Sequence, residues 1–416
     1  MMLDALRLAF FATLMLGGAS LERLSETFGE LGAFGEARFV GLLLVATALA
    51  LRAAARGKPE AIPGPLFVWL LLLALLHAEV ATSWLWSDRT PYAWTQLLEL
   101  GFSAGALALA VPLFRDAPER CLRLMLVSFY AAALAFVLAS LAFFGAPAGE
   151  LASAGAGGIG SARLLCMGIV AAVWLLREAG QRGWALLLPT PLMLAGAVAS
   201  GSRASVLALA VSLGVCWMRW QRESLAPVTA APPSRAAVVG LAGVALFVVL
   251  AVPFTRGLAT LWLEQLLAPS SGSGAVYLAD RDVIFLDGWR QFSANALAGI
   301  GIGSYVGPFG EQYPHNLLLS YAIDAGGLAL ACALWALGWG FAALSRQRGD
   351  AAGAALSGAA FFAVASCFAG SYYDARFLWI FLLLGFLLRA PVGARAGVVR
   401  FVRASIAQPS TKCASG

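Results

Sequence analysis

The sequence predicts an all-α polytopic integral membrane protein, and both its composition and its apolar runs support this class. Hydrophobic residues make up 61% of the 416 positions and charged residues only 12%, and the mean hydropathy is +0.82. Soluble domains are far more polar than this. Long apolar runs recur along the chain. A run of roughly 20 such residues spans a bilayer as a helix, because hydrocarbon offers the backbone no other hydrogen-bond partner.

The apolar runs correspond to about twelve membrane-spanning helices, each close to the length that a bilayer requires. We expect them near residues 4–20, 37–54, 63–84, 92–114, 121–143, 160–177, 183–200, 203–219, 235–255, 314–344, 353–370 and 376–390. A signal peptide is the alternative for the first run, but the later helices and the alternating loop charges favour a retained helix. The tenth run is expected to tilt or break at Gly326-Gly327. No boundary marks a second domain, so residues 1–416 are expected to form one membrane domain.

Lys and Arg predict which loops face the cytoplasm, because cytoplasmic loops collect them. With the N-terminus inside, the inner loops and the C-terminal tail hold about nineteen of the 28 basic residues. These are Arg7, Arg52, Arg56, Lys58, Arg115, Arg120, Arg123, Arg177, Arg182, Arg219, Arg222, Arg235, Arg346, Arg348, Arg389, Arg395, Arg400, Arg403 and Lys412. Both termini are then cytoplasmic, and residues 391–416 form a basic tail that faces anionic lipid headgroups. Residues 256–313 form one long outer segment between the ninth and tenth helices.

The net charge of +6 comes mostly from this inner rim and gives no reason to expect nucleic acid as a partner. Membrane lipids are the partners that it predicts.

Two arginines at the predicted outer boundary are candidate ligands for an anion. Arg203 follows the Ser200-Gly201-Ser202 turn. It is either an anchor that reaches lipid headgroups or an anion ligand beside the free N–H groups of a helix start. Arg281 lies in an amphipathic run, on an apolar face that it shares with Ile284, Phe285, Gly288 and Phe292, with Trp289 at the edge. A guanidinium there needs an anionic partner, and we favour a bound anion over a structural salt bridge.

The Tyr313-Pro314-His315-Asn316 sequence predicts a general base. Pro314 fits the first position of the tenth helix, which places His315 and Asn316 in its first turn at the outer boundary. The positive end of a helix favours a neutral imidazole, which is the form that accepts a proton. A capping or interface histidine is the alternative interpretation.

Metal binding is not predicted. Asp280-Arg281-Asp282 matches the Asp-x-Asp pattern of many sugar-nucleotide transferases, but on a helix the two carboxylates would project about 200° apart. No further oxygen-rich cluster accompanies them, so we expect neither a metal nor another cofactor.

The order of these motifs resembles the O-antigen ligase and polymerase family. The Ser-Gly-Ser-Arg turn at 200–203 is followed by Arg281 and Trp289, then by the glycine run Gly299-Ile300-Gly301-Ile302-Gly303, and finally by His315-Asn316-Leu317-Leu318 and Asp324-Ala325-Gly326-Gly327. The topology is similar over nearly the whole chain, whereas the motifs lie between Ser200 and Gly327. Asp324 stands where the family pattern has Glu, and the proline that often precedes the glycine run is missing.

The resemblance implies a GT-C-like glycosyltransferase in the inner membrane of a Gram-negative bacterium. The donor would be an undecaprenyl-diphosphate-linked O-antigen, and the acceptor a hydroxyl on the periplasmic face, where residues 256–313 would lie. Arg203 and Arg281 would bind the donor diphosphate, His315 would take the acceptor proton, and Asn316 would orient either group. The single long outer segment favours a ligase, whose acceptor is lipid A-core, over a polymerase or a protein O-oligosaccharyltransferase.

Two interpretations stay open. Tyr372, Tyr373, Asp374 and Arg376 form the last outer turn, as an interfacial aromatic anchor or as part of an acceptor groove. A lipid-linked glycan flippase or another transporter is the alternative from a different class. Transporters show repeated halves and midplane charges, whereas the charges here gather at the outer rim.

Overall fold

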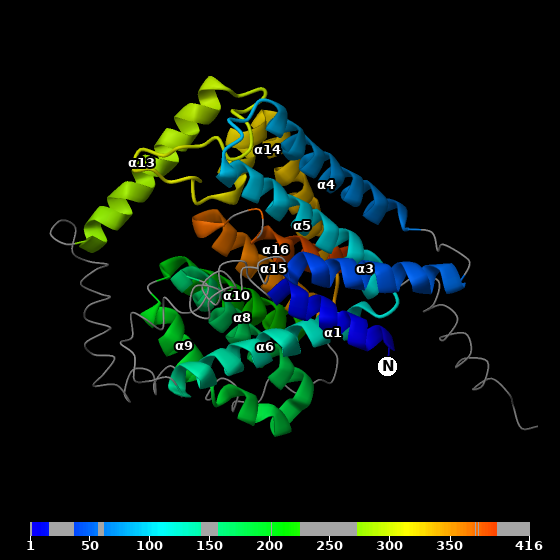
Figure 1. Cartoon of the computed structure of the whole chain (residues 1–416). Helices are drawn as coiled ribbons and strands as arrows, with labels where there is room; N and C mark the ends of the chain where they lie inside the picture. Colours follow the sequence, from blue (N-terminus) through cyan, green and yellow to red (C-terminus); the bar gives the residue numbers. More distant parts are fainter. Residues whose placement is uncertain are drawn as a thin grey trace, which may run out of the picture.

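The computed structural model describes residues 2–15, 37–56, 62–142, 157–200, 202–224, 273–370, 372 and 374–388. All regular structure in these ranges is helical, as Figure 1 shows. Within the described ranges, seven helices are long and apolar enough to cross a membrane. The predicted class, an α-helical membrane protein with several spans, is thereby confirmed. The ninth expected span, residues 256–272 of the outer segment and the basic tail lie outside the described residues.

The described elements follow one another as a series of helices with two short 3-10 helices, η2 and η3. In chain order they are α1 Met2–Met15, α3 Ala37–Arg56, α4 Gly64–Thr82, η2 Ser83–Leu85, α5 Pro91–Phe114, α6 Pro118–Ala142, α8 Gly157–Ala179, η3 Gly180–Leu187, α9 Thr190–Ala199, α10 Arg203–Ser224, α13 Ser273–Ala294, α14 Leu317–Ser345, α15 Asp350–Ala369 and α16 Ala375–Leu387.

The expected span at 183–200 is not a continuous α-helix. It divides into η3 and α9, and Pro189 precedes the first residue of α9. Proline lacks the N–H that a continuing helix requires. With ten residues, α9 is about 15 Å long, half of the hydrocarbon thickness.

The last helix, α16, lies at the centre of the molecule. It has 13 residues, and all but its last are buried. Helices α5, α14 and α15 pack around it, and Figure 1 shows it enclosed by them. A helix that is apolar on every side is expected in such a central position. The expected span at 376–390 is therefore a core helix, about 20 Å long.

Helix α14 breaks at Gly326, which confirms the predicted interruption. Gly326 has φ 85° and ψ −169° inside an otherwise helical segment. The break frees carbonyl groups in the preceding turn, and the loop after α13 uses them. Ile300 N–H donates to the Ile323 carbonyl at 2.8 Å, and Gly301 N–H donates to the Asp324 carbonyl at 3.0 Å.

Arginines of the predicted inner set gather at one end of the bundle. Ion pairs join Arg120 to Asp4 at 2.8 Å and Arg177 to Asp350 at 2.6 Å. Further pairs at this end are Arg52–Asp116 and Arg123–Glu178. These contacts connect the start of α1 with the end of α8 and with the α14–α15 turn. The starts of α5, α10 and α14 therefore lie at the opposite end. Which side of the membrane each end faces stays a prediction.

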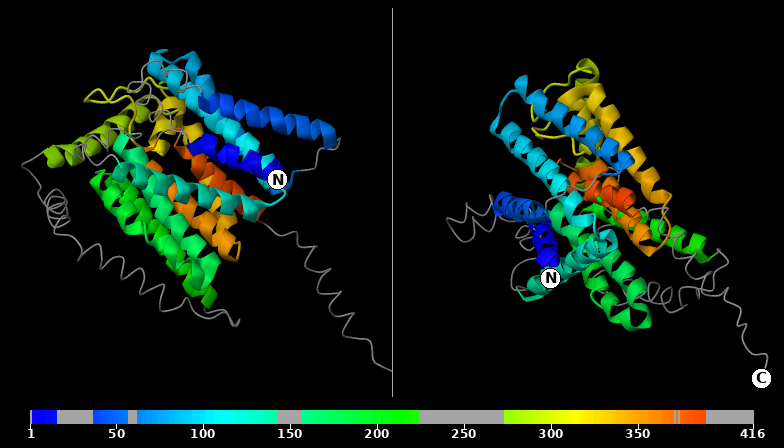
Figure 2. Two further views of the ribbon diagram at one scale, coloured as in Figure 1. Left: turned by 60° about the horizontal axis from the view of Figure 1, so that its bottom comes forward. Right: turned by 90° about the vertical axis from the view of Figure 1, so that its right-hand side faces the viewer.

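Helix α13 packs against α14 at the end of the bundle away from these arginines, and Figure 2 shows it beside that helix from two directions. Ile284 is 4% exposed, and Gly288 lies against Leu319 and Ile323. The predicted apolar face is only partly correct. Phe285 and Trp289 are 46% and 49% exposed, so the buried stripe is narrower than expected.

Candidate active site

The glycine run 299–303 forms a tight loop that only glycine can make. Gly299, Gly301 and Gly303 have φ values of 68°, 98° and 65°, in the left-handed region that side chains disfavour. A Cβ atom at each would also overlap the backbone of a neighbour, at Asp324, Ser87 and Ala93 respectively. The loop is therefore pressed against α14 on one side and against the η2–α5 connection on the other.

Serine side chains fasten the same loop to the end of α4. Ile302 N–H donates to Ser83 Oγ at 2.9 Å, and Ser87 Oγ donates to the Ile302 carbonyl at 2.7 Å. Ser83 is fully buried. The backbone N–H and carbonyl groups of this loop have no partners within a helix. The serine side chains supply those partners, because buried backbone groups without a hydrogen bond are costly.

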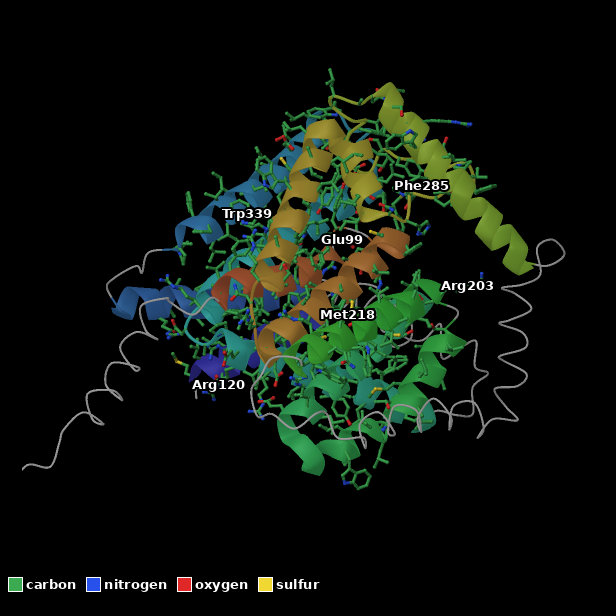
Figure 3. The ribbon with its side chains drawn as sticks, turned by 180° about the vertical axis from the view of Figure 1, so that it is seen from behind. Glu99, Arg120, Arg203, Met218, Phe285 and Trp339 are labelled. Atoms are coloured by element: carbon green, nitrogen blue, oxygen red, sulfur yellow. The ribbon has the colours of Figure 1, made fainter. Side chains whose placement is uncertain are left out.

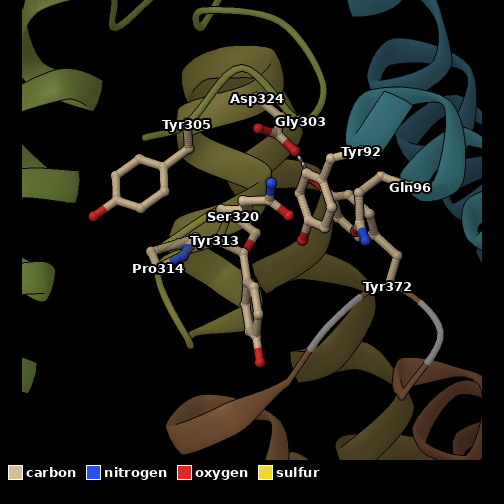
Figure 4. Close-up of a pocket in the computed structure, with 10 residues that line it drawn as sticks. Tyr92, Gln96, Gly303, Tyr305, Tyr313, Pro314, Ser320, Asp324 and Tyr372 are labelled. Atoms are coloured by element: carbon tan, nitrogen blue, oxygen red, sulfur yellow. Dashed lines mark hydrogen bonds between the residues drawn. The ribbon is translucent and has the colours of Figure 1, made fainter. Parts of the chain in front are cut away.

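A polar pocket opens where this loop, the start of α5 and the start of α14 meet. The pocket is small and partly open to solvent, and Figure 4 shows its lining. The lining residues are Tyr92, Gln96, Gly303, Tyr305, Gln312, Tyr313, Pro314, Ser320, Asp324 and Tyr372. Three of the predicted motifs thus meet in one place: the glycine run, the Tyr-Pro-His-Asn sequence and the Asp324 segment.

Asp324 ties three segments together at the base of the pocket. Tyr372 donates its hydroxyl to Asp324 Oδ2 at 2.5 Å, and the backbone N–H of Gly303 donates to the same carboxyl. Burial, followed by the charge of Asp324, raises the pKa of Tyr372 well above its usual value, so this hydroxyl stays a donor. Tyr372 is 2% exposed. Its reading as an interfacial anchor is wrong, and it belongs to the pocket.

His315 precedes α14 instead of lying in its first turn. The helix begins at Leu317 with Asn316 as its N-cap, so the expectation that Pro314 occupies the first helical position is wrong. The His315 backbone has φ 54°, one of two positive values among the described residues other than glycine. Its ring lies 4.2 Å from the ring of Tyr313, measured between centroids. Such a backbone is uncommon outside glycine and is often found at functional sites.

Asn316 caps α14 and is held by two hydrogen bonds. Its Oδ1 accepts from Leu319 N–H at 3.0 Å, and its Nδ2 donates to the Cys367 carbonyl at 2.8 Å. Both ends of the amide are therefore engaged within the protein. The expected role of Asn316 in orienting one of the reacting groups stays a prediction.

The two predicted anion ligands lie on different helices. Arg203 is the first residue of α10 and is half-buried. It makes no hydrogen bond or ion pair with another residue in the described part of the chain. Figure 3 shows it at the end of α10 that faces the side of α13. Position 281 lies in α13, but its side chain, and hence its predicted anion contact, lies outside the described residues.

A buried polar cluster adjoins the pocket, and sequence reasoning missed most of it. Arg163 is 6% exposed and pairs with Asp374 at 2.7 Å. Gln96 lines the pocket and donates to Glu99 at 3.2 Å. One signal in the sequence could have identified this cluster. Ionisable and polar side chains within an apolar span are expected to face the interior of the bundle.

The fold and this site define an α-helical membrane protein with a tyrosine-lined polar pocket at one end of its bundle. Comparison of the chain with protein-family models and with curated proteins finds no match. Across the ranges that the structure describes, no group of three or more His, Cys, Asp or Glu side chains is placed to hold a metal ion. The expectation of a reaction without metal stays a prediction.

Proposed function

We propose that this protein is an O-antigen ligase of the bacterial inner membrane. It transfers a polysaccharide from undecaprenyl diphosphate to a hydroxyl of lipid A-core on the periplasmic face. The observation that carries the proposal is the meeting of the glycine run, Tyr313 and Asp324 in one pocket beside His315. Its location, at the bundle end away from the arginine-rich rim, agrees with a periplasmic reaction.

The proposed mechanism is a single displacement with inversion. His315 accepts the proton of the acceptor hydroxyl as that oxygen forms a bond to the anomeric carbon. The bond from the anomeric carbon to the lipid diphosphate breaks, and the diphosphate leaves with the electron pair. Arg203 and Arg281 bind the leaving group, because a guanidinium fork matches phosphate oxygens and stabilises the developing charge. No nucleotide or metal takes part.

One observation bears on the transporter alternative. Transporters use broken helices whose freed carbonyl groups coordinate ions, and α14 is broken at Gly326. Here the carbonyls of Ile323 and Asp324 accept from the N–H groups of Ile300 and Gly301. The break thus holds the glycine loop instead of an ion, which favours a rigid catalytic site over a transport path.

Transfer by the purified protein tests the proposal. Wild type is incubated with an undecaprenyl-diphosphate glycan and lipid A-core, with and without EDTA. We expect transfer in both conditions. Elongation of the donor without transfer to lipid A-core would make the protein a polymerase, and transfer to a protein hydroxyl an oligosaccharyltransferase. No transfer, combined with movement of the glycan across vesicle membranes, would support the transporter instead.

His315→Gly and His315→Ala form a matched pair for the catalytic base. Glycine adopts φ 54° without strain, whereas alanine does not. If His315 is the base, both variants lose activity by roughly 10²–10⁴-fold. Activity retained in the glycine variant alone would mean that the histidine matters only for the backbone.

Arg203→Lys tests the phosphate role. Lysine keeps the charge but not the bidentate fork, so we expect transfer to fall by roughly 10²–10³-fold, with little rescue relative to Arg203→Ala. Arg290→Lys on the exposed side of α13 is the control. Equal activity of wild type and Arg203→Ala would contradict diphosphate binding by this residue.

A further inference from the structure

We infer that α13 is an interfacial helix, and that its exposed stripe of Phe285, Leu286 and Trp289 is inserted into the lipid leaflet at the pocket end of the bundle. All three side chains are large, apolar and exposed. The inference holds whether or not the protein transfers a glycan, because it concerns only the surface of α13 and the membrane.

The orientation of α13 distinguishes it from the spans. Figure 1 shows it lying across the end of the bundle, crosswise to α5, where it packs against α14. It is not among the seven described helices that are long and apolar enough to cross a membrane. A helix that lies along the membrane surface and has an apolar side binds at the boundary between headgroups and acyl chains.

The side chains of α13 divide its circumference into three sides. The side that faces α14 contains Ile284 and Gly288. The exposed stripe begins about 100° further around the helix, since Phe285 and Trp289 each follow one of these residues. The third side is polar and holds Asp287, Arg290 and Gln291. A helix between protein and water needs only one apolar and one polar side, whereas a second apolar side fits contact with lipid.

Tryptophans at the same end of the bundle mark the level of the membrane surface. Trp86 and Trp94, beside and within the start of α5, are about as exposed as Trp289. Tryptophan is enriched at membrane–water interfaces, because its ring is apolar and its N–H is polar. Helix α5 is one of the candidate spans, so its start lies near this surface. The neighbouring stripe on α13 is therefore assigned to lipid.

Hydrogen bonds hold α13 at the level of the pocket. Tyr305, which lines the pocket, donates its hydroxyl to the Ile284 carbonyl at 3.2 Å. Gln291 Nε2 donates to the Val306 carbonyl at 3.3 Å. The stripe faces away from these contacts, so one helix diameter, roughly 10 Å, separates the pocket loop from the acyl chains. The pocket therefore opens beside the lipid headgroups instead of in bulk water.

Spin labels on α13 test the inference in the full-length protein, in vesicles of phosphatidylethanolamine and phosphatidylglycerol. The labelled variants are Phe285→Cys, Trp289→Cys and, as a matched control, Ala294→Cys. Ala294 is also exposed, and it projects about 140° away from Trp289. Cys367 and Cys413 are replaced by serine. Collision rates of each label are measured with oxygen, which concentrates among acyl chains, and with a water-soluble nickel chelate.

We expect the ratio of oxygen to nickel collisions to be at least about three-fold higher at positions 285 and 289 than at position 294. Equal ratios at the three positions would place the stripe in water and would overturn the inference. Exclusion of both reagents from positions 285 and 289 would mean that protein covers the stripe, from another segment or from a second copy of the chain. That result would also overturn it.

Fluorescence quenching supplies a second readout without a label. The contribution of Trp289 is the difference between wild type and Trp289→Phe, a variant that keeps an apolar ring at an exposed position. We expect lipids brominated near the headgroup to quench this contribution more strongly than lipids brominated near the chain end. A contribution that neither lipid quenches would contradict insertion of the stripe.

Discussion

Asp324 shows how one side chain can join distant parts of this chain. It accepts hydrogen bonds from Tyr372, which precedes α16, and from Gly303 in the glycine loop. It is only 6% exposed, so both donors would be left without a partner if the carboxyl were removed. Unpaired polar groups in a buried position are costly, which makes this residue structurally important whatever its part in the chemistry.

At this position we predict that Asp324→Ala lowers the free energy of unfolding by about 2–4 kcal/mol, because two buried donors lose their acceptor. Tyr372→Phe should cost less, since it removes one donor and the carboxyl keeps the Gly303 bond. Thermal unfolding in detergent measures both changes. The double variant should be less destabilised than the sum of the single ones. Strict additivity would mean that the two side chains do not interact.

His315 has a backbone conformation that glycine adopts more easily. We predict that His315→Gly unfolds at the same or a higher temperature than His315→Ala, because φ 54° strains any residue with a Cβ atom. The measurement is thermal unfolding of the two variants side by side. A clearly less stable glycine variant would show that contacts of the Cβ atom outweigh the backbone strain.

At the scale of the element, the break in α14 determines where the glycine loop binds. The break lies at Gly326. A Cβ atom at this residue would overlap the carbonyl oxygen of Leu297, in the segment that leads into the glycine loop. Gly338 lies in the regular part of this helix, and open space surrounds its Cβ position. The two glycines therefore differ in environment although they belong to one helix.

We predict that Gly326→Ala destabilises the protein by at least about 2 kcal/mol, from strain at positive φ and from overlap with the loop. Gly338→Ala should be neutral or stabilising by up to about 1 kcal/mol. Thermal unfolding checks both. The Gly326 variant should also lose transfer activity if it folds, since the glycine loop lines the pocket. Equal stability of the two variants would contradict the importance of the break.

At the scale of the whole molecule, the helices place the arginine-rich rim and the pocket at opposite ends. Arg348 is exposed in the α14–α15 turn at the arginine-rich end, and Phe309 is 57% exposed in the loop beside the pocket. In a bacterial membrane the positions of the arginines predict which end of the bundle faces which side. The arginine-rich end is expected in the cytoplasm, because basic loops are retained there, and the pocket is then expected on the periplasmic side.

We predict that Phe309→Cys reacts with a membrane-impermeant maleimide in intact cells whose outer membrane is permeabilised. Arg348→Cys should react only after the inner membrane is opened. Cys367 and Cys413 are replaced by serine in this experiment, so that they cannot react with the maleimide. The cysteines at 121, 166, 216 and 332 are kept because they are buried. The reverse pattern of labelling would place the pocket in the cytoplasm, and this would contradict the proposed ligase.

Sequence reasoning identified the motifs of the site but only part of its lining. Gly326, the glycine run and Asp324 were recognised because their patterns are local. Tyr92 and Gln96 were missed, since the sequence around them reads as the start of an ordinary apolar span. The sequence left Tyr372 with two interpretations, an interfacial anchor or part of a groove, and only its burial in the folded chain assigns it to the pocket. The position of a side chain relative to elements far along the chain is not encoded in any local pattern.

The sequence by itself determined the class of protein, because the requirement that backbone groups be satisfied in hydrocarbon makes long apolar runs helical wherever they occur. It also determined the break in α14, since the Gly326-Gly327 pair weakens a helix locally. Only the tertiary structure decided that α16 is the buried centre, that His315 precedes its helix, and that Tyr92, Tyr313 and Asp324 enclose one pocket. These features depend on packing between segments that are distant in the chain, and the free energy of such contacts appears only when the helices assemble.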